Sequence, residues 1–149
     1  MHCLKYKGDN ELGVYLGRLY GIELCQSDYY SGVDVIIPVA LHRKKQRQRG
    51  YNQSEMIGIG LARSLNVEMN PNILKRATST QTQTRKNRFQ RWQNVESSFM
   101  VKKKEKVVDK HLLLVDDVVT TGATLEACAS SLLAIEGVKV SCCAIAWAL

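Results

Sequence analysis

The sequence predicts an α/β fold in which a mostly parallel central sheet is covered by helices on both faces. Apolar runs of strand length, near residues 33–37, 112–115 and 138–149, alternate with helical patterns along the chain. Parallel strands need such crossover helices, and strands buried on both faces are apolar throughout. The 149 residues are the size of one such domain with a sizeable core.

The first half of the chain predicts two helices around one strand. A helix is expected from Asn10 to about Leu24, because apolar residues recur at helical spacing at Leu12, Tyr15, Leu16, Leu19 and Ile22. Residues 33–37 predict a short buried strand that Pro38 closes. The basic run 43–49 is expected to be a loop. Asn52, three residues before Glu55, then predicts the start of a helix that continues to about Asn66.

The second half predicts the rest of the sheet. Residues 73–74 and 99–101 are weak strand candidates, and the polar, basic residues 78–94 are expected to form a long mobile segment. The apolar run 112–115 predicts a strand that stops at two acids. A helix that Gly137 terminates and a final strand over 138–149 follow. The apolar face of that helix is expected to consist of Leu125, Cys128, Ala129, Leu132 and Leu133.

The composition excludes several classes of protein. With 45% apolar and 23% charged residues it is typical of a globular domain, and no apolar run approaches the roughly 18 residues of a membrane span. The first nine residues do not resemble a signal peptide. The five cysteines form no C-x-x-C pair, which favours free thiols in a reducing cytoplasm over a zinc site.

The net charge of +7 favours an anionic partner, either nucleic acid or a polyphosphate ligand. Much of the excess lies in the runs 43–49 and 102–104. Solvated surface is the ordinary explanation for such runs.

Residues 112–124 carry the most informative pattern, a strand followed by Asp116-Asp117 and the turn Thr120-Thr121-Gly122-Ala123-Thr124. Adjacent carboxylates could accept hydrogen bonds from vicinal ribose hydroxyls and lie near a hydrated Mg²⁺. The turn opens a helix, whose first N–H groups and dipole favour phosphate. A diol site beside a phosphate site describes a ribose 5-phosphate.

Three other interpretations compete with this one. The acids and the turn could be structural, although two adjacent carboxylates repel each other when no ligand is present. A P-loop nucleotidase requires an upstream G-x-x-x-x-G-K-[ST], which is absent from the 149 residues. A phosphoacceptor receiver domain has most of its fold after the acids, whereas only 32 residues (149 minus 117) follow Asp117.

Residues 115–124 resemble the signature with which type I phosphoribosyltransferases bind phosphoribosyl pyrophosphate (PRPP). The stretches 37–42 and 49–53 narrow this resemblance to the ComF family of competence-associated proteins, as do residues 4–8 and the set Gln83, Thr84, Arg91, Asn94 and Phe99. Members commonly carry a cysteine-rich zinc module ahead of the Lys5-Tyr6 block. The chain is therefore expected to be one phosphoribosyltransferase-like domain over 1–149, either a short member or a fragment.

The resemblance implies a role for four groups of residues. Asp116 and Asp117 would act at the ribose as the catalytic acids, and Thr120, Thr121, Gly122, Ala123 and Thr124 would bind the 5-phosphate. The pyrophosphate would meet Pro38, Val39, Ala40 and Arg43. Gln83, Thr84, Arg91 and Asn94 would belong to a flexible loop over the reacting centre. No residue is expected to ligate a metal, because Mg²⁺ would be bound through PRPP.

The implied activity is transfer of a phosphoribosyl group to or from a nitrogenous base or a related acceptor, which would place the chain in nucleotide metabolism as a glycosyltransferase. The alternative is a PRPP-binding or DNA-uptake accessory protein without turnover. Single-stranded DNA, the competence machinery and a second copy of the chain are the other expected partners. The basic residues 43–49 followed by Tyr51 favour DNA, whereas their place beside the pyrophosphate turn favours PRPP.

Overall fold

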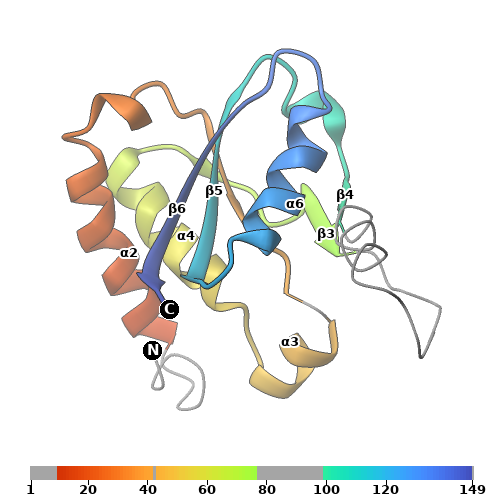
Figure 1. Ribbon diagram of the computed structural model, residues 1–149. Helices are drawn as coiled ribbons and strands as arrows, with labels where there is room; N and C mark the ends of the chain where they lie inside the picture. The colour runs from red at the N-terminus through yellow and green to blue at the C-terminus, as the bar shows by residue number, and fades with distance from the viewer. Residues whose placement is uncertain (1–9, 42, 77–98, 149) are drawn as a thin grey trace.

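A four-stranded, all-parallel sheet forms the centre of the computed structural model, which describes residues 10–41, 43–76 and 99–148 (Figure 1). The strand order is β2-β1-β5-β6, and the strands are Glu68–Met69, Val35–Pro38, His111–Val119 and Lys139–Trp147. A separate antiparallel pair consists of β3 (Leu74–Arg76) and β4 (Phe99–Val101). The predicted α/β class with a mostly parallel sheet is confirmed.

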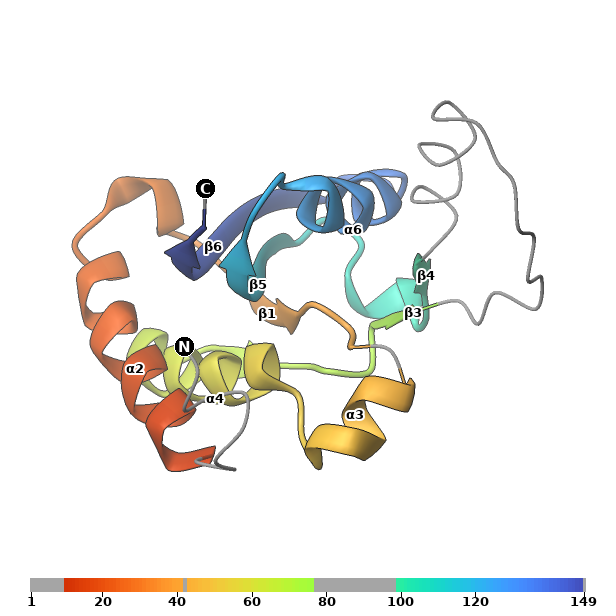
Figure 2. The same cartoon turned by 60° about the horizontal axis from the view of Figure 1, so that its bottom comes forward.

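Helices cover both faces of the sheet (Figure 2). Two of them, α2 and α4, lie on one face, and α6 lies on the other together with the β3–β4 pair. The helices are α2 (Asn10–Leu24), α3 (Arg43–Arg49), α4 (Gln53–Leu65) and α6 (Ala123–Leu133), with single 3-10 turns at η1 (Asp28–Tyr30) and η2 (Lys104–Lys106). None of the helices in the described ranges is both long and apolar enough to cross a membrane.

Strand β5 separates two hydrophobic cores. Its side chains alternate between the faces of the sheet, as the period of a β-strand requires. Leu112 and Leu114 pack toward α6, whereas Leu113 and Val115 pack toward α2 and α4. All four side chains are fully buried, so β5 is the rigid centre from which the next residues of the chain extend.

Helices α2 and α4 cross in contact through their backbones. The side of α2 that faces α4 carries the buried Gly13, Gly17 and Gly21. A Cβ atom added to Gly17 would meet the Ile57 carbonyl group, and one added to Gly60 would meet the Val14 carbonyl oxygen. No residue larger than glycine fits at this crossing unless the helices move apart.

The predicted bounds of α2 are confirmed, but its predicted apolar face is wrong. Tyr15, Leu19 and Ile22 are 58%, 46% and 53% exposed, while the glycine face is buried. The hydrophobic pattern predicts burial from side-chain character. Close backbone packing selects the smallest residue instead, and glycine contributes nothing to that pattern.

Four further expectations need correction. The basic run 43–49 is helix α3 instead of a loop, and the short strand β2 was not predicted. Strand β5 does not stop at the acids but continues through them to Val119. Helix α6 ends at Leu133, which is exposed, and Gly137 lies in the following turn with a φ of 69°. The N-terminal cap of α4 at Asn52 and its left-handed end at Asn66 agree with the prediction.

Candidate functional site

The two acids lie on β5 where that strand extends past its neighbour β1. Pro38, the last residue of β1, pairs with Val115, so Asp116 is the first residue beyond the end of β1. On its other side β5 stays paired with β6, where Asp116 lies opposite Ala144. The acids are therefore held on a paired strand at the carboxyl edge of the sheet. Ligands of parallel α/β sheets bind at this edge.

The Asp116 carboxylate is partly buried and contacts a second element of the fold. Its Oδ1 atom accepts a hydrogen bond from the Ser54 hydroxyl of α4 at 2.9 Å, and one from the Asp117 N–H at 2.9 Å. Burial raises the pKa of Asp116 to about 6, because the loss of water around the carboxylate outweighs these two bonds and the nearby Asp117 adds to it. A carboxyl group with a raised pKa at a ligand-binding edge is typical of functional sites.

The turn from β5 into α6 forms a shallow hollow of about 30 Å³, lined by Asp116 and residues 118–125. Thr120 and Thr121 are exposed in it. Gly122 caps α6 with a φ of 79°, a conformation that favours glycine, and an added Cβ atom would meet nothing within 4 Å. The first intrahelical bond runs from the Glu126 N–H to the Gly122 carbonyl, and the Ala123 N–H donates to the Thr121 hydroxyl oxygen at 3.5 Å. The other N–H groups at the start of α6 have no partner within the helix and could donate to an anion above the turn.

The turn after β1 is fixed by α4. The Val39 N–H donates to the Val115 carbonyl at 2.8 Å, which ties the turn to β5. The Asn52 side chain donates from Nδ2 to the Val39 carbonyl at 2.9 Å. Its Oδ1 accepts the Ser54 N–H at 3.2 Å and so caps α4. This turn and the start of α4 consequently form one hydrogen-bonded unit.

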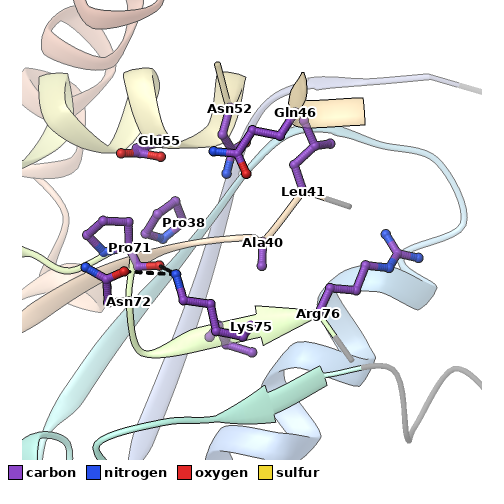
Figure 3. A pocket seen from close by; sticks show the side chains of 11 residues that line it. Pro38, Ala40, Leu41, Gln46, Asn52, Glu55, Pro71, Asn72, Lys75 and Arg76 are labelled. Atoms are coloured by element: carbon purple, nitrogen blue, oxygen red, sulfur yellow. Dashed lines mark hydrogen bonds between the residues drawn. The ribbon is translucent and has the colours of Figure 1, made fainter. Parts of the chain in front are cut away.

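A cavity of about 390 Å³ opens beside this turn (Figure 3). Its walls come from β1 and the turn, from α3 and α4, and from β3 with the segment that leads into it. The lining residues are Pro38, Ala40, Leu41, Gln46, Asn52, Glu55, Pro71, Asn72, Leu74, Lys75 and Arg76. The volume lies within the range of ordinary small-molecule sites.

Among the described residues, Lys75 and Arg76 are the cations that line this cavity, and neither was predicted from the sequence. Lys75 Nζ donates to the Asn72 side chain at 2.9 Å and to the Pro71 carbonyl at 3.3 Å. The Arg76 guanidinium lies 5.4 Å from the centre of the Phe99 ring. These contacts hold both cations at the end of β3. Only their place directly after a weak strand could have indicated them, because isolated basic residues are common on surfaces.

Helix α3 presents its basic residues in two ways. Arg47 is exposed, whereas Arg49 donates from Nη1 to Oε1 of the buried Gln53 at 3.1 Å. Arg49 therefore helps to join α3 to α4. Arg43 begins α3, and its side chain lies outside the part of the structure that can be described.

The predicted flexible-loop residues, Gln83, Thr84, Arg91 and Asn94, also lie outside the described residues. The chain leaves the described part at Arg76 and returns at Phe99, and these two residues are register partners in the β3–β4 pair. Arg76, the last described residue before this gap, lines the cavity.

The described residues offer no group of three or more His, Cys, Asp or Glu side chains that could hold a metal ion. Two cysteines are unsuited to nucleophilic chemistry. Burial raises the pKa of the Cys143 thiol to about 12 and that of Cys128 well above its usual range.

Comparison with known sequences identifies one matching protein family and several relatives of this chain. A family model described as the phosphoribosyl transferase domain matches residues 45–148. The DNA utilization protein YhgH of Escherichia coli O157:H7 is 32% identical over 136 residues, which are 89% of this chain and 59% of that protein. Competence protein F of Haemophilus influenzae is 36% identical over 110 residues, 72% of this chain and 48% of that protein. The chain spans less than two thirds of the length of either relative.

Two solved structures have a similar fold. The allosteric regulatory enzyme of purine biosynthesis superposes with a TM-score of 0.57 at 18% identity, covering 87% of this chain and 25% of that one. The adenine phosphoribosyltransferase of Thermoanaerobacter pseudethanolicus gives a TM-score of 0.50 at 20% identity, covering 85% of this chain and 65% of that one. At these identities the likeness concerns the arrangement of the chain alone.

Proposed function

Because the chain belongs to the phosphoribosyl transferase domain family, as a ComF-type member with the type I fold, we propose that it binds PRPP with Mg²⁺ and transfers the phosphoribosyl group to a nitrogenous acceptor. One observation carries this proposal. The acids Asp116 and Asp117 lie on β5 directly before the turn that opens α6, and Val115 of the same strand bonds to the turn after β1, which lines a cavity with two cations among its described residues.

Each part of the site matches one part of PRPP. The carboxylates of Asp116 and Asp117 accept hydrogen bonds from the two ribose hydroxyls. The N–H groups and hydroxyls of 120–124 bind the 5-phosphate, which the positive end of the α6 dipole also favours. The turn 38–40 meets the pyrophosphate. Lys75 and Arg76, in the adjoining cavity, offset the charge of its oxygens.

The proposed reaction exchanges one bond at the anomeric carbon for another. The bond between that carbon and the pyrophosphate oxygen breaks, and its electron pair leaves with the pyrophosphate. A nitrogen lone pair of the acceptor forms the new bond, and the acceptor loses a proton. Bound Mg²⁺ would add positive charge at the pyrophosphate, held by oxygens of PRPP itself.

The protein residues act on the charges that develop in this exchange. Positive charge develops on the ribose as the bond breaks, and the ionised pair Asp116 and Asp117 stabilises it at short range. Negative charge develops on the pyrophosphate, next to Lys75 and Arg76. A site that holds opposite charges at opposite ends of the breaking bond favours its transition state over its ground state.

Titration calorimetry with PRPP and Mg²⁺ tests the proposal. The wild-type chain should bind PRPP, and the double variant Asp116→Asn with Asp117→Asn should lose that binding while it remains folded. Asp28→Asn is the matched control, since Asp28 is exposed in η1 at the opposite edge of the sheet. A double variant that keeps wild-type affinity for PRPP would refute the assignment. If the wild type binds PRPP, a screen of nucleobases with the wild type would then identify the acceptor.

A second candidate function is single-stranded DNA binding without transfer. The two relatives are named for DNA utilization and for competence, and α3 exposes Arg47 within a strongly basic sequence. Each DNA phosphate that the chain neutralises should steepen the salt dependence of affinity by about 0.7. Tight single-strand binding with this salt dependence, together with no PRPP binding, would favour this function over the first.

A further inference from the structure

The first turn of α4 reaches both halves of the proposed site. Asn52 bonds to the turn after β1, and two residues later Ser54 bonds to the acid on β5. Both residues are buried, with 7% and 4% of their surfaces exposed. Between them, the buried Gln53 accepts the hydrogen bond from Arg49 of α3. The turn after β1, the strand β5 and the preceding helix α3 therefore all bond to one helical turn.

The two bonds of Asn52 have different purposes. A helix cap needs an acceptor, which Asn52 Oδ1 supplies to the Ser54 N–H. Its donor, Nδ2, is not needed for capping and instead bonds to the Val39 carbonyl. The peptide bonds of the described chain are trans, so the C=O of Val39 and the N–H of Ala40 point in opposite directions. Asn52 thereby directs the Ala40 N–H away from α4.

The Ala40 N–H makes no backbone hydrogen bond with any of the described residues. It lies in the turn that lines the cavity containing Lys75 and Arg76. Asn52 thus fixes the direction of the Ala40 N–H, and an anion in this cavity could accept a hydrogen bond from it.

Ser54 fixes the Asp116 carboxylate as Asn52 fixes the turn after β1. Its hydroxyl is 2.9 Å from Asp116 Oδ1, and a serine at the second position of a helix is not required for capping. The groups that act on the Asp116 carboxylate are the Ser54 hydroxyl of α4 and the Asp117 carboxylate and N–H of its own strand. The charge of Asp116 also raises the pKa of the Cys128 thiol of α6. Among these, the Ser54 hydroxyl is the one side-chain donor that stabilises the ionised form.

We propose that Asn52 and Ser54 are positioning residues, which fix the ribose acid and the pyrophosphate turn relative to each other through one rigid turn of α4. This inference rests on the proposed function. It predicts that the two halves of the site can be weakened separately, by removing one hydrogen bond at a time, while the fold is retained.

The first experiment uses Asn52→Ser. Serine caps a helix about as well as asparagine and carries no charge, but its side chain is too short to reach the Val39 carbonyl. We expect PRPP and inorganic pyrophosphate to bind about tenfold more weakly, the effect of one lost hydrogen bond, while ribose 5-phosphate binds within about twofold of wild type. Asn52→Ala removes the cap as well and should lower the melting temperature, which Asn52→Ser should preserve. Equal weakening of all three ligands in Asn52→Ser would overturn the inference.

The second experiment uses Ser54→Ala and a carboxyl NMR titration of the ligand-free protein. Loss of the donor should raise the pKa of Asp116 above its wild-type value. As the pH is lowered, Asp116 is then protonated earlier, so ribose 5-phosphate binding should begin to weaken at a higher pH than it does in wild type. Ser64→Ala is the matched control, because the Ser64 hydroxyl lies in the same helix and donates to the Arg18 carbonyl at the same 2.9 Å. Ser54→Thr, which keeps the hydroxyl, should restore the wild-type titration.

The outcomes separate the inference from the proposed function. If the wild type binds no PRPP, the proposed function fails, whereas the titration of Asp116 still decides whether Ser54 controls this carboxyl group. If Asp116 titrates alike in wild type and Ser54→Ala, or if Ser64→Ala shifts it equally, Ser54 has no positioning role.

Discussion

Asp116 should reduce the stability of the protein, and Asp116→Asn should therefore stabilise the fold. Burial raises the pKa of this carboxyl from its ordinary value of 3.8 to about 6. A shift of one unit corresponds to about 1.36 kcal/mol, so keeping Asp116 ionised costs the folded state roughly 3 kcal/mol at neutral pH. Asparagine is isosteric, and its Oδ1 can still accept from Ser54 and from the Asp117 N–H.

The sign of the pH dependence follows from the raised pKa. Between pH 3.8 and about 6 the folded state binds more protons at Asp116 than the unfolded state does. This group therefore lowers the free energy of unfolding as the pH rises through that window, and its cost is complete above it. The advantage of Asp116→Asn should be roughly 3 kcal/mol at about pH 8, about half as large near pH 5, and nearly absent below about pH 4.

Urea denaturation of the ligand-free protein at several pH values measures this difference. Asp28→Asn, in exposed η1, is the matched control. The reasoning is refuted if Asp116→Asn is no more stable than wild type near pH 8, or if its advantage is the same at pH 4 and pH 8. A gain in stability together with lost PRPP binding would mark Asp116 as a residue kept for function.

Two glycine substitutions test the turn before α6 and the helix crossing, each against a matched control. Gly122→Val should abolish PRPP and ribose 5-phosphate binding. Gly32→Val, at a similar φ of 76° and with no atom near its Cβ, should leave binding unchanged, while each substitution should lower the free energy of unfolding by about 1–3 kcal/mol. Gly60→Ala should destabilise the fold by about 1–3 kcal/mol, measured by urea denaturation. Gly58→Ala, whose Cβ would meet Met69 at an ordinary 3.4 Å, should change stability by less than about 1 kcal/mol. Equal binding by the first pair, or equal stability of the second, would contradict these assignments.

The sequence predicted where most elements begin and end, because those signals are local. Asn52 capped α4 as expected, and the bounds of α2 agreed with the apolar spacing. The buried face of α2 could not be predicted in the same way, since the close approach of α2 to α4 depends on two glycine surfaces meeting. Contacts between elements that are distant in sequence leave no periodic pattern in either of them.

The end of β5 was misjudged for a related reason. An apolar run reports burial, and burial ends at Val115 because β1 ends there. The hydrogen-bonded strand continues to Val119, because β6 is long enough to pair with it. The apolar pattern therefore indicates the point at which β1 no longer covers β5, which is also where the polar site begins. The same limit applies to Lys75 and Arg76, which reach the cavity only through the β3–β4 pair.

The position of the acids on a paired strand affects how the proposed site can work. A strand buried on both faces up to Val115 moves little, so Asp116 and Asp117 start from a fixed point before any ligand arrives. Ser54 adds a second anchor at the Asp116 carboxylate, and Asn52 extends the same rigid turn to the Val39 carbonyl. Preorganised groups of this kind stabilise developing charge without having to reorient during the reaction. The raised pKa of Asp116 is then the energetic consequence of holding a carboxylate in place, away from water, where a ribose hydroxyl would replace the lost solvent.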